Sequence, residues 1–170
     1  MTLSESEVIG VLKGRPESAS GPDGIQLPQL KACLPETLAR WMNIFLYCGR
    51  LPRVLNRGRV TLIPKVKEPV NASEYRPITV YSHVARIFHK LIAKRLASLR
   101  MSWRQKGFRN MDGCAEHVAT IKALLRRARA QRKDTYLVFI DVKRAFPSVS
   151  HGSLIAAARR AGIPVSHWHR

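Results

Sequence analysis

The sequence predicts an α+β protein that is mostly helical, with one β-hairpin and one buried β-strand. Apolar residues recur at helical spacing over residues 35–49, 82–99 and 113–133. Short runs rich in branched and aromatic residues, bounded by polar residues, Gly or Pro, occupy 58–64, 76–80 and 136–140. A chain of 170 residues with 45% hydrophobic composition is long enough for one core and too short for two ordinary domains.

The first fifty residues predict a helix, a loop and a second helix. Ser4-Glu5-Ser6-Glu7 places acids at the start of a short helix that continues to Leu12. Residues 17–24 form a loop, because Gly21-Pro22-Asp23-Gly24 is a strong turn signal. The second helix begins near Pro35 and can end at Gly49. Its apolar stripe is expected to be core: Leu38, Trp41, Met42, Phe45 and Leu46.

The middle of the chain predicts an antiparallel hairpin. Residues 58–64 and 76–80 are β-type runs joined by the polar connection 65–75. Pro64 and Pro77 cannot donate to a ladder, so they confine each strand to an edge or to short pairing.

Three further helices and one strand follow. The helix over 82–99 carries its apolar residues on one face, and Asp112-Gly113 opens the next helix. That helix has an inner stripe at Val118, Ile121, Leu124 and Leu125, and an outer face with Lys122, Arg126, Arg127, Arg129, Arg132 and Lys133. Such a face is either simply solvated or faces phosphates, and both interpretations stay open. A buried strand at 136–140 precedes a last helix over 150–161.

Charge is the strongest constraint on partners. The net charge is +19, and residues 1–50 contain five basic and five acidic side chains, so the excess lies entirely in 51–170. A one-sided field of this kind attracts polyanions, of which nucleic acid is the commonest. An anionic membrane surface is the rival, disfavoured by a packed core that contains strands. No apolar run approaches 18 residues, so no membrane span is expected. The three cysteines, widely spaced and without a CxxC pair, predict reduced packing residues of an intracellular protein and no zinc site.

Three segments contain candidate functional residues. Lys65 and Arg76 would flank the hairpin and offer a triphosphate one point charge and one bidentate fork, although such a pair can be incidental in a basic protein. Residues 105–109 and 112–116 place glycines and cations before the basic helix, where a nucleic-acid strand could approach; a plain loop and helix cap explains them too. Asp141 ends the predicted strand, where it could hold Mg²⁺ or start a turn. One carboxylate cannot hold two ions, and His151 is expected to be a cap or surface residue.

The chain resembles the reverse transcriptase domain of non-LTR retrotransposons, in particular the elements that insert into ribosomal RNA genes. Six short motifs in order support the resemblance: Ser-Ala-Ser-Gly-Pro-Asp-Gly-Ile (18–25), Leu-Ile-Pro-Lys (62–65), Tyr-Arg-Pro-Ile (75–78), Gln-Lys-Gly-Phe (105–108), Asp-Gly-Cys-Ala-Glu (112–116) and Ile-Asp-Val-Lys-Arg-Ala-Phe (140–146).

The resemblance implies the fingers and a partial palm of a right-hand polymerase, without a thumb. Residues 1–134 would be a fingers-like region with N-terminal helices, and 135–170 the start of the palm. Asp141 would be the first metal-binding catalytic aspartate, with Val142 lending a backbone carbonyl and Phe146 excluding a 2′-hydroxyl as the steric gate. Lys65 and Arg76 would hold the triphosphate. The nucleic-acid contacts near the template–primer would come from Arg109, Lys122, Arg126 and Arg129.

The implied reaction is Mg²⁺-dependent extension of a DNA primer with dNTPs on an RNA template, acting in the nucleus at the site of insertion. Two departures from the family matter. Pro147 stands where the family usually has Asp, and the later hairpin with two adjacent aspartates is absent. The chain alone is therefore not expected to polymerise. The alternative is a non-catalytic nucleic-acid-binding relic that retains the basic surface.

Overall fold

The computed structural model describes residues 2–97, 99, 102–108, 111–143 and 145–163. These residues divide into two units, and each is described by itself. The N-terminal unit comprises the described residues up to 97, and the C-terminal unit comprises those from 99 to 163. The combination of helices with a small antiparallel sheet is the α+β class that the sequence predicts.

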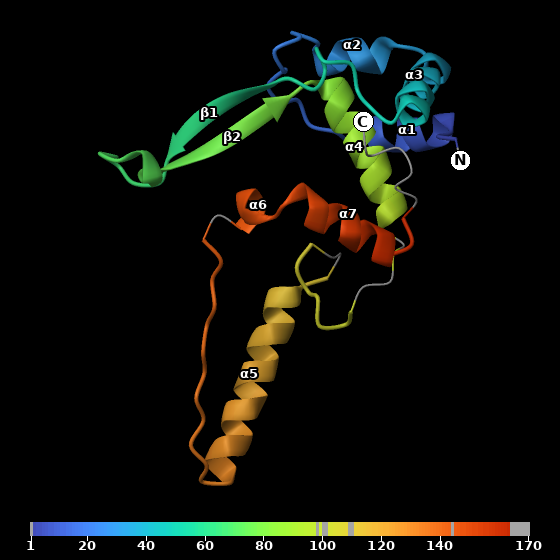
Figure 1. Ribbon diagram of the computed structural model, residues 1–170. Helices are drawn as coiled ribbons and strands as arrows, with labels where there is room; N and C mark the ends of the chain where they lie inside the picture. The colour runs from blue at the N-terminus through green and yellow to red at the C-terminus, as the bar shows by residue number, and fades with distance from the viewer. Residues whose placement is uncertain (1, 98, 100–101, 109–110, 144, 164–170) are drawn as a thin grey trace. The chain divides into compact units, whose positions relative to one another are not determined.

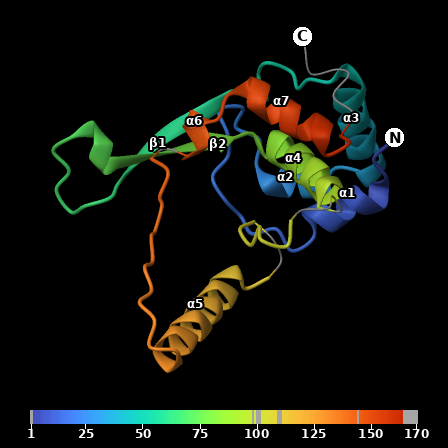
Figure 2. The same cartoon turned by 60° about the horizontal axis from the view of Figure 1, so that its bottom comes forward.

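The core lies in the N-terminal unit, among four helices: α1 (Glu5–Leu12), α2 (Leu27–Ala32), α3 (Pro35–Cys48) and α4 (His83–Leu96). Helix α1 packs against both α3 and α4 (Figures 1 and 2). The apolar faces of these helices and two adjoining leucines bury one cluster: Leu3, Val8, Val11, Leu12, Leu27, Leu30, Leu38, Ala39, Met42, Phe45, Leu55, Val84, Ile87 and Leu91. Burial of this cluster is the main force that holds the unit together.

Local sequence explains where these helices begin and end. Ser4 accepts a hydrogen bond from Glu7 N while the Glu7 side chain accepts one from Ser4 N, which forms a capping box. Pro35 is the first residue of α3, and Gly49 ends that helix with a φ of 63°. The predictions for α1, α3 and α4 are confirmed. The stripe predicted for α3 is wrong at Trp41, which is 53% exposed and rests its ring against Phe45 at 6.3 Å between centroids.

The predicted hairpin is confirmed. Strands β1 (Gly58–Pro64) and β2 (Tyr75–Tyr81) pair antiparallel from Gly58 opposite Tyr81 to Pro64 opposite Tyr75. A short 3₁₀ turn, Ala72–Glu74, lies in the connection. The hairpin extends away from the helices of its own unit (Figure 1). With two strands, both edges are open, which is where prolines are tolerated.

The loop before α2 packs on the junction between β2 and α4. A Cβ on Gly21 would lie 2.7 Å from Ser82 Cα, so only glycine fits there. The buried side chain of His83 has its Nε2 3.2 Å from the Ser18 carbonyl oxygen, and Arg86 donates to Ser18 Oγ and to Ala19 O. These bonds fix the loop to the start of α4. Burial lowers the pKa of His83, and the positive charge of Arg86 lowers it further.

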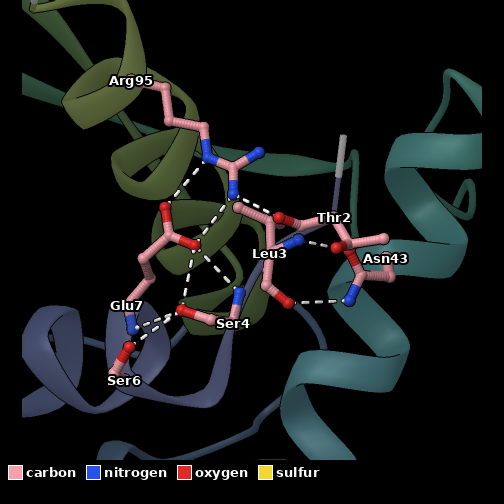
Figure 3. A network of polar contacts seen from close by, with 7 residues as sticks. All are labelled: Thr2, Leu3, Ser4, Ser6, Glu7, Asn43 and Arg95. Carbon is pink, nitrogen blue, oxygen red and sulfur yellow. Dashed lines mark hydrogen bonds and ion pairs between the residues drawn. The ribbon is translucent and has the colours of Figure 1, made fainter.

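A polar network ties α1 to its neighbours (Figure 3). Arg95 of α4 donates through Nε and Nη2 to the Glu7 carboxylate at 2.9 and 2.8 Å, and also to Thr2 O. Asn43 of α3 bonds the backbone of Leu3 in both directions, accepting from its N–H at 2.6 Å and donating to its carbonyl at 2.9 Å. The start of the chain is therefore held by side chains from α3 and α4.

The C-terminal unit contains α5 (Gly113–Ala130), the short α6 (Ala145–Ser148) and α7 (His151–Arg160). The predicted helices over 113–133 and 150–161 are confirmed, with Asp112 capping α5 through a bond from Ala115 N. None of the residues described in this unit is buried. The inner stripe predicted for α5 is therefore wrong as a core: Val118 is 50% and Leu124 52% exposed, because nothing described packs on them.

The predicted buried strand at 136–140 is also wrong. Residues 134–142 form no strand, and Tyr136, Phe139 and Ile140 are each more than 80% exposed. A β-strand is stabilised by the ladder it forms with a neighbour and by packing on its faces. The described residues of this unit provide neither. The segment that leads to Asp141 therefore remains extended and unpaired.

Two smaller expectations can be compared with the structure. All three cysteines are free, as expected, but they are exposed rather than packed: Cys33, Cys48 and Cys114. Among the described residues, no helix combines the length and apolarity that a membrane crossing requires.

Candidate nucleotide and nucleic-acid site

The hairpin carries Lys65 and Arg76 on one face. The ladder continues one residue past β1, where Lys65 N donates to Glu74 O at 2.7 Å. Arg76 is paired with Ile63, two residues before Lys65. Because side chains alternate between faces, residues 63, 65 and 76 share a face, and Lys65 and Arg76 are diagonal neighbours. The sequence-based expectation that both cations project from the same ribbon fits this register.

The two cations differ in how far they are already engaged. Lys65 Nζ donates to Ser73 O at 2.6 Å, whereas exposed Arg76 has no hydrogen bond or ion pair with any described residue. Glu74 is occupied by the backbone, since its carboxylate accepts from Val70 N and Asn71 N at 2.6 and 2.9 Å. These bonds, with a smaller effect from Lys65, lower the pKa of Glu74. The guanidinium of Arg76 is thus available to an external anion.

A third cation on this face was not singled out from the sequence. Arg59 is exposed and is paired with Val80, which places it on the same face as Ile63 and Arg76. Its Nη2 lies 3.5 Å from Ser20 O. The signal was present in the two-residue period of the strand, in which 59, 61, 63 and 65 all point one way.

Asp141 and Val142 lie on the extended segment of the C-terminal unit, and both are exposed. Among the residues described, no three His, Cys, Asp or Glu side chains come together as a metal site would require. Asp141 therefore offers one carboxylate, and the described residues do not by themselves fit a centre of two magnesium ions.

Phe146 is brought against a second motif. It lies in α6 and contacts Phe108 edge to face, with ring centroids 6.1 Å apart and planes at 76°. Lys106, two residues before Phe108, forms an ion pair with Glu116 of α5. Gly113 fits closely beneath this segment, since a Cβ there would lie 2.7 Å from Lys106 Cβ. The motifs at 105–108, 112–116 and 140–146 thus meet around the start of α5.

The cations predicted for nucleic-acid contact lie along α5. Lys122, Arg126 and Arg129 follow the spacing of one helix face and are exposed. None of the three makes an ion pair with a described acid, so this face is uniformly positive. Arg109 lies outside the described residues. The hairpin cations belong to the N-terminal unit, and Asp141, Phe146 and α5 to the C-terminal unit.

Comparison with known proteins gives a consistent assignment. The family described as reverse transcriptase (RNA-dependent DNA polymerase) matches residues 63–170, from β1 past Asp141. The chain is 34% identical over 148 residues to the Pol polyprotein of the type-2 retrotransposable element R2DM of Drosophila melanogaster, covering 86% of this chain and 14% of that protein.

Other relatives agree. The Pol polyprotein of the R2 element of Popillia japonica is 34% identical over 163 residues, which cover 95% of this chain and 22% of that protein. A probable RNA-directed DNA polymerase from transposon BS of Drosophila melanogaster is 28% identical over 165 residues, covering 91% of this chain and 18% of its own length. The chain thus spans less than a quarter of the length of these relatives. It belongs to the reverse transcriptase family, as a fragment similar to the polymerases of R2-type non-LTR retrotransposons.

Proposed function

We propose that this chain is the fingers and the beginning of the palm of an RNA-directed DNA polymerase that extends a DNA primer with dNTPs on an RNA template. The observation that carries the proposal is the hairpin: the family match begins on β1, and Arg76 presents an unengaged guanidinium beside Lys65 on one face. Lys and Arg are the side chains that bind the oxygens of a triphosphate.

Each predicted residue has a role in this proposal. Lys65 and Arg76 bind the triphosphate, and Phe146 limits the space beneath the incoming sugar. The exposed cations of α5 and Arg109 neutralise phosphates of the template–primer, which is sequence-independent contact. The proposed site of action is the nucleus, where a template and its chromosomal target meet.

Magnesium enters only in the complete domain. Asp141 and the Val142 carbonyl would contribute to its binding, and the ion would stabilise charge on the transferring phosphoryl group. The remaining carboxylates are not among the described residues. We therefore derive no catalytic step for this chain alone, and we expect it to be inactive without the rest of the palm.

The alternative is a nucleic-acid-binding protein without catalysis. Pro147, in place of an expected acid, and the single unaccompanied carboxylate at Asp141 favour it for the chain as it stands. Both functions share the +19 charge, so a binding assay cannot separate them. An incorporation assay in a completed domain does.

The test is Asp141→Asn in this chain joined to the remainder of the palm and thumb of an R2-type relative. Incorporation should fall by about 10²–10³-fold, the loss typical of removing a group that stabilises charge in the transition state. Template affinity should change less than about twofold, because the carboxylate does not contact phosphates attractively.

The control is Asp134→Asn, which removes an exposed acid of the same segment that has no proposed role. Its incorporation rate should equal that of the parent. Full incorporation by the Asp141 variant would remove the catalytic assignment, and no incorporation by the unsubstituted chimera would favour the non-catalytic alternative.

A further inference from the structure

A cleft of about 560 Å³ lies in the N-terminal unit, between α4 and the loop that follows α1. Four of its lining residues come from one face of α4, at spacings of three, four and seven, and the others from the end of α1 and the loop: Arg86, His89, Lys90, Ala93, Val11, Arg15, Pro16 and Ser18. Its volume falls within the range of about 300–1,000 Å³ typical of small-ligand sites.

The cleft concentrates positive charge without a compensating acid in its lining. Arg86 is fixed by the loop, donating to Ser18 Oγ at 3.1 Å and to Ala19 O at 2.6 Å. Arg15 and Lys90 make no side-chain hydrogen bond or ion pair with any described residue. One turn further along α4, Lys94 is instead engaged by Gly10 O. Burial lowers the pKa of Arg86, and the charge of Arg15 lowers it further, which shows that two guanidinium groups face each other.

The rest of the lining is apolar. Val11, Pro16 and Ala93 form its uncharged part, and the exposed imidazole of His89 lies beside Lys90 at the cleft. A ligand that suits these walls carries a phosphate for the cations and a flat, weakly polar body for the apolar residues. A nucleotide has both parts. A lone inorganic anion would leave the apolar part uncovered.

We propose that this cleft binds one nucleotide unit of a single nucleic-acid strand, with its phosphate on Arg15 and Lys90 and its base against Val11, Pro16 and Ala93. Arg86 positions the loop so that Arg15 faces the cleft. The site lies on α1 and α4, apart from Lys65 and Arg76 on the hairpin and from the cations of α5. It rests on the nucleic-acid binding of the proposed function and adds a second point of contact within the N-terminal unit.

The test compares two double variants of the 170-residue chain that remove equal charge. Arg15→Ala with Lys90→Ala removes the unengaged cations of the cleft, and Arg50→Ala with Arg53→Ala removes two exposed cations of the same unit that do not line it. Binding of a labelled 15-nucleotide oligouridine RNA is measured by fluorescence anisotropy between 50 and 200 mM salt. Thermal unfolding of each variant checks that its fold is intact.

The cleft variant should bind at least about fivefold more weakly than the control variant. Its plot of log affinity against log salt should be flatter by about 0.7 for each lost phosphate contact. Equal loss in both variants would overturn the proposal, because only net charge would then matter. No RNA binding by the unsubstituted chain would overturn the nucleic-acid function itself.

Adenosine monophosphate and inorganic phosphate, added in separate titrations, distinguish the sources of the phosphate. The proposal expects either to bind weakly and to compete with RNA only at millimolar concentration. Tight binding of free adenosine monophosphate that depends on Arg15 and Lys90, with RNA binding unchanged in the cleft variant, would assign the cleft to a free nucleotide and overturn the strand assignment.

Discussion

Gly21 shows how a single residue position joins two elements of the N-terminal unit. The loop backbone at this residue lies directly on Tyr81 and Ser82, where β2 becomes α4. A methyl group there would meet backbone atoms, which cannot move aside as the end of a flexible side chain can. The glycine belongs to the Ser-Ala-Ser-Gly-Pro-Asp-Gly-Ile motif, so the structure gives that motif a packing role.

Gly21→Ala should therefore lower the free energy of unfolding by about 1–3 kcal/mol, the usual effect of overpacking. Urea unfolding monitored by circular dichroism measures it. Gly10→Ala is the matched control, because Gly10 lies in α1 with only Lys94 Nζ within 4 Å, at 3.8 Å, of an added Cβ. That change should stabilise the protein by about 0.5–1 kcal/mol through helix propensity. Equal stability of the Gly21 variant and the parent would contradict the close packing.

Phe146 is the residue whose proposed role most directly concerns specificity. Its ring lies against Phe108, which gives it a fixed neighbour within the C-terminal unit. If it limits the space beneath the sugar, Phe146→Ala should open that space and admit a 2′-hydroxyl. Discrimination between dNTPs and rNTPs in the completed domain should fall by about 10²-fold, since loss of steric exclusion removes a few kcal/mol of difference.

The measurement is the ratio of kcat/KM for dCTP and CTP on one RNA template. Phe108→Ala tests whether the effect arises through the ring contact: it should reduce discrimination less than the Phe146 change. An unchanged ratio in the Phe146 variant would remove the gate assignment while leaving the family assignment intact.

At the scale of elements, α1 depends on charges from α4 as well as on its apolar face. The Glu7 carboxylate accepts from Arg95 and from its own capping residue Ser4, and these bonds lower its pKa from 4.5 to about 2. A carboxyl whose pKa falls on folding stabilises the native state above its unfolded pKa. That stabilisation is lost as the pH falls from about 4.5 through about 2.

Between pH 5 and pH 2, the parent should therefore lose more stability than Glu7→Gln, which keeps a capping side chain but does not titrate. The expected difference is about 1 kcal/mol, because 35% of the Glu7 side chain is exposed and solvent screens the pair. Urea unfolding at half-unit intervals of pH measures it. Parallel pH profiles for the two proteins would show that the Glu7–Arg95 contact does not contribute.

The hairpin and the segment 136–140 show how far local pattern determines an element. Both read as β-type runs, and only the hairpin formed. Its two strands are close in sequence and supply each other's ladder. Residues 136–140 have the same kind of composition, but their ladder requires a partner strand that the described residues do not contain. The period of a sequence predicts a strand only where a neighbour exists.

At the scale of the whole molecule, the charge should dominate binding. The excess of +19 lies beyond residue 50, and the three cations of one α5 face are all exposed. Nucleic-acid affinity should therefore be largely independent of sequence and should fall by about 10³-fold or more between 50 and 200 mM salt, as expected for several phosphate contacts. Anisotropy with two RNAs of unrelated sequence measures both properties. An affinity that does not change with salt would contradict an electrostatic origin.

The charge also has a control within the chain. Replacing Lys122, Arg126 and Arg129 together by Ala should flatten the salt dependence for both RNAs to the same extent, because phosphate contacts carry no sequence information. A loss confined to one of the two RNAs would instead indicate that α5 reads bases.

The sequence by itself determined the α+β class, the hairpin, the long helices and the family, because these depend on local periods, caps and short motifs. Ser4, Pro35, Gly49 and Asp112 each act within one turn of their own position. Tertiary structure decided what depends on distant neighbours: the exposure of Trp41 and Ile140, the addition of Arg59 to the cationic face, and the cleft between Arg15 and Lys90. Burial and proximity arise from contacts between segments far apart in the chain, and no local pattern records them.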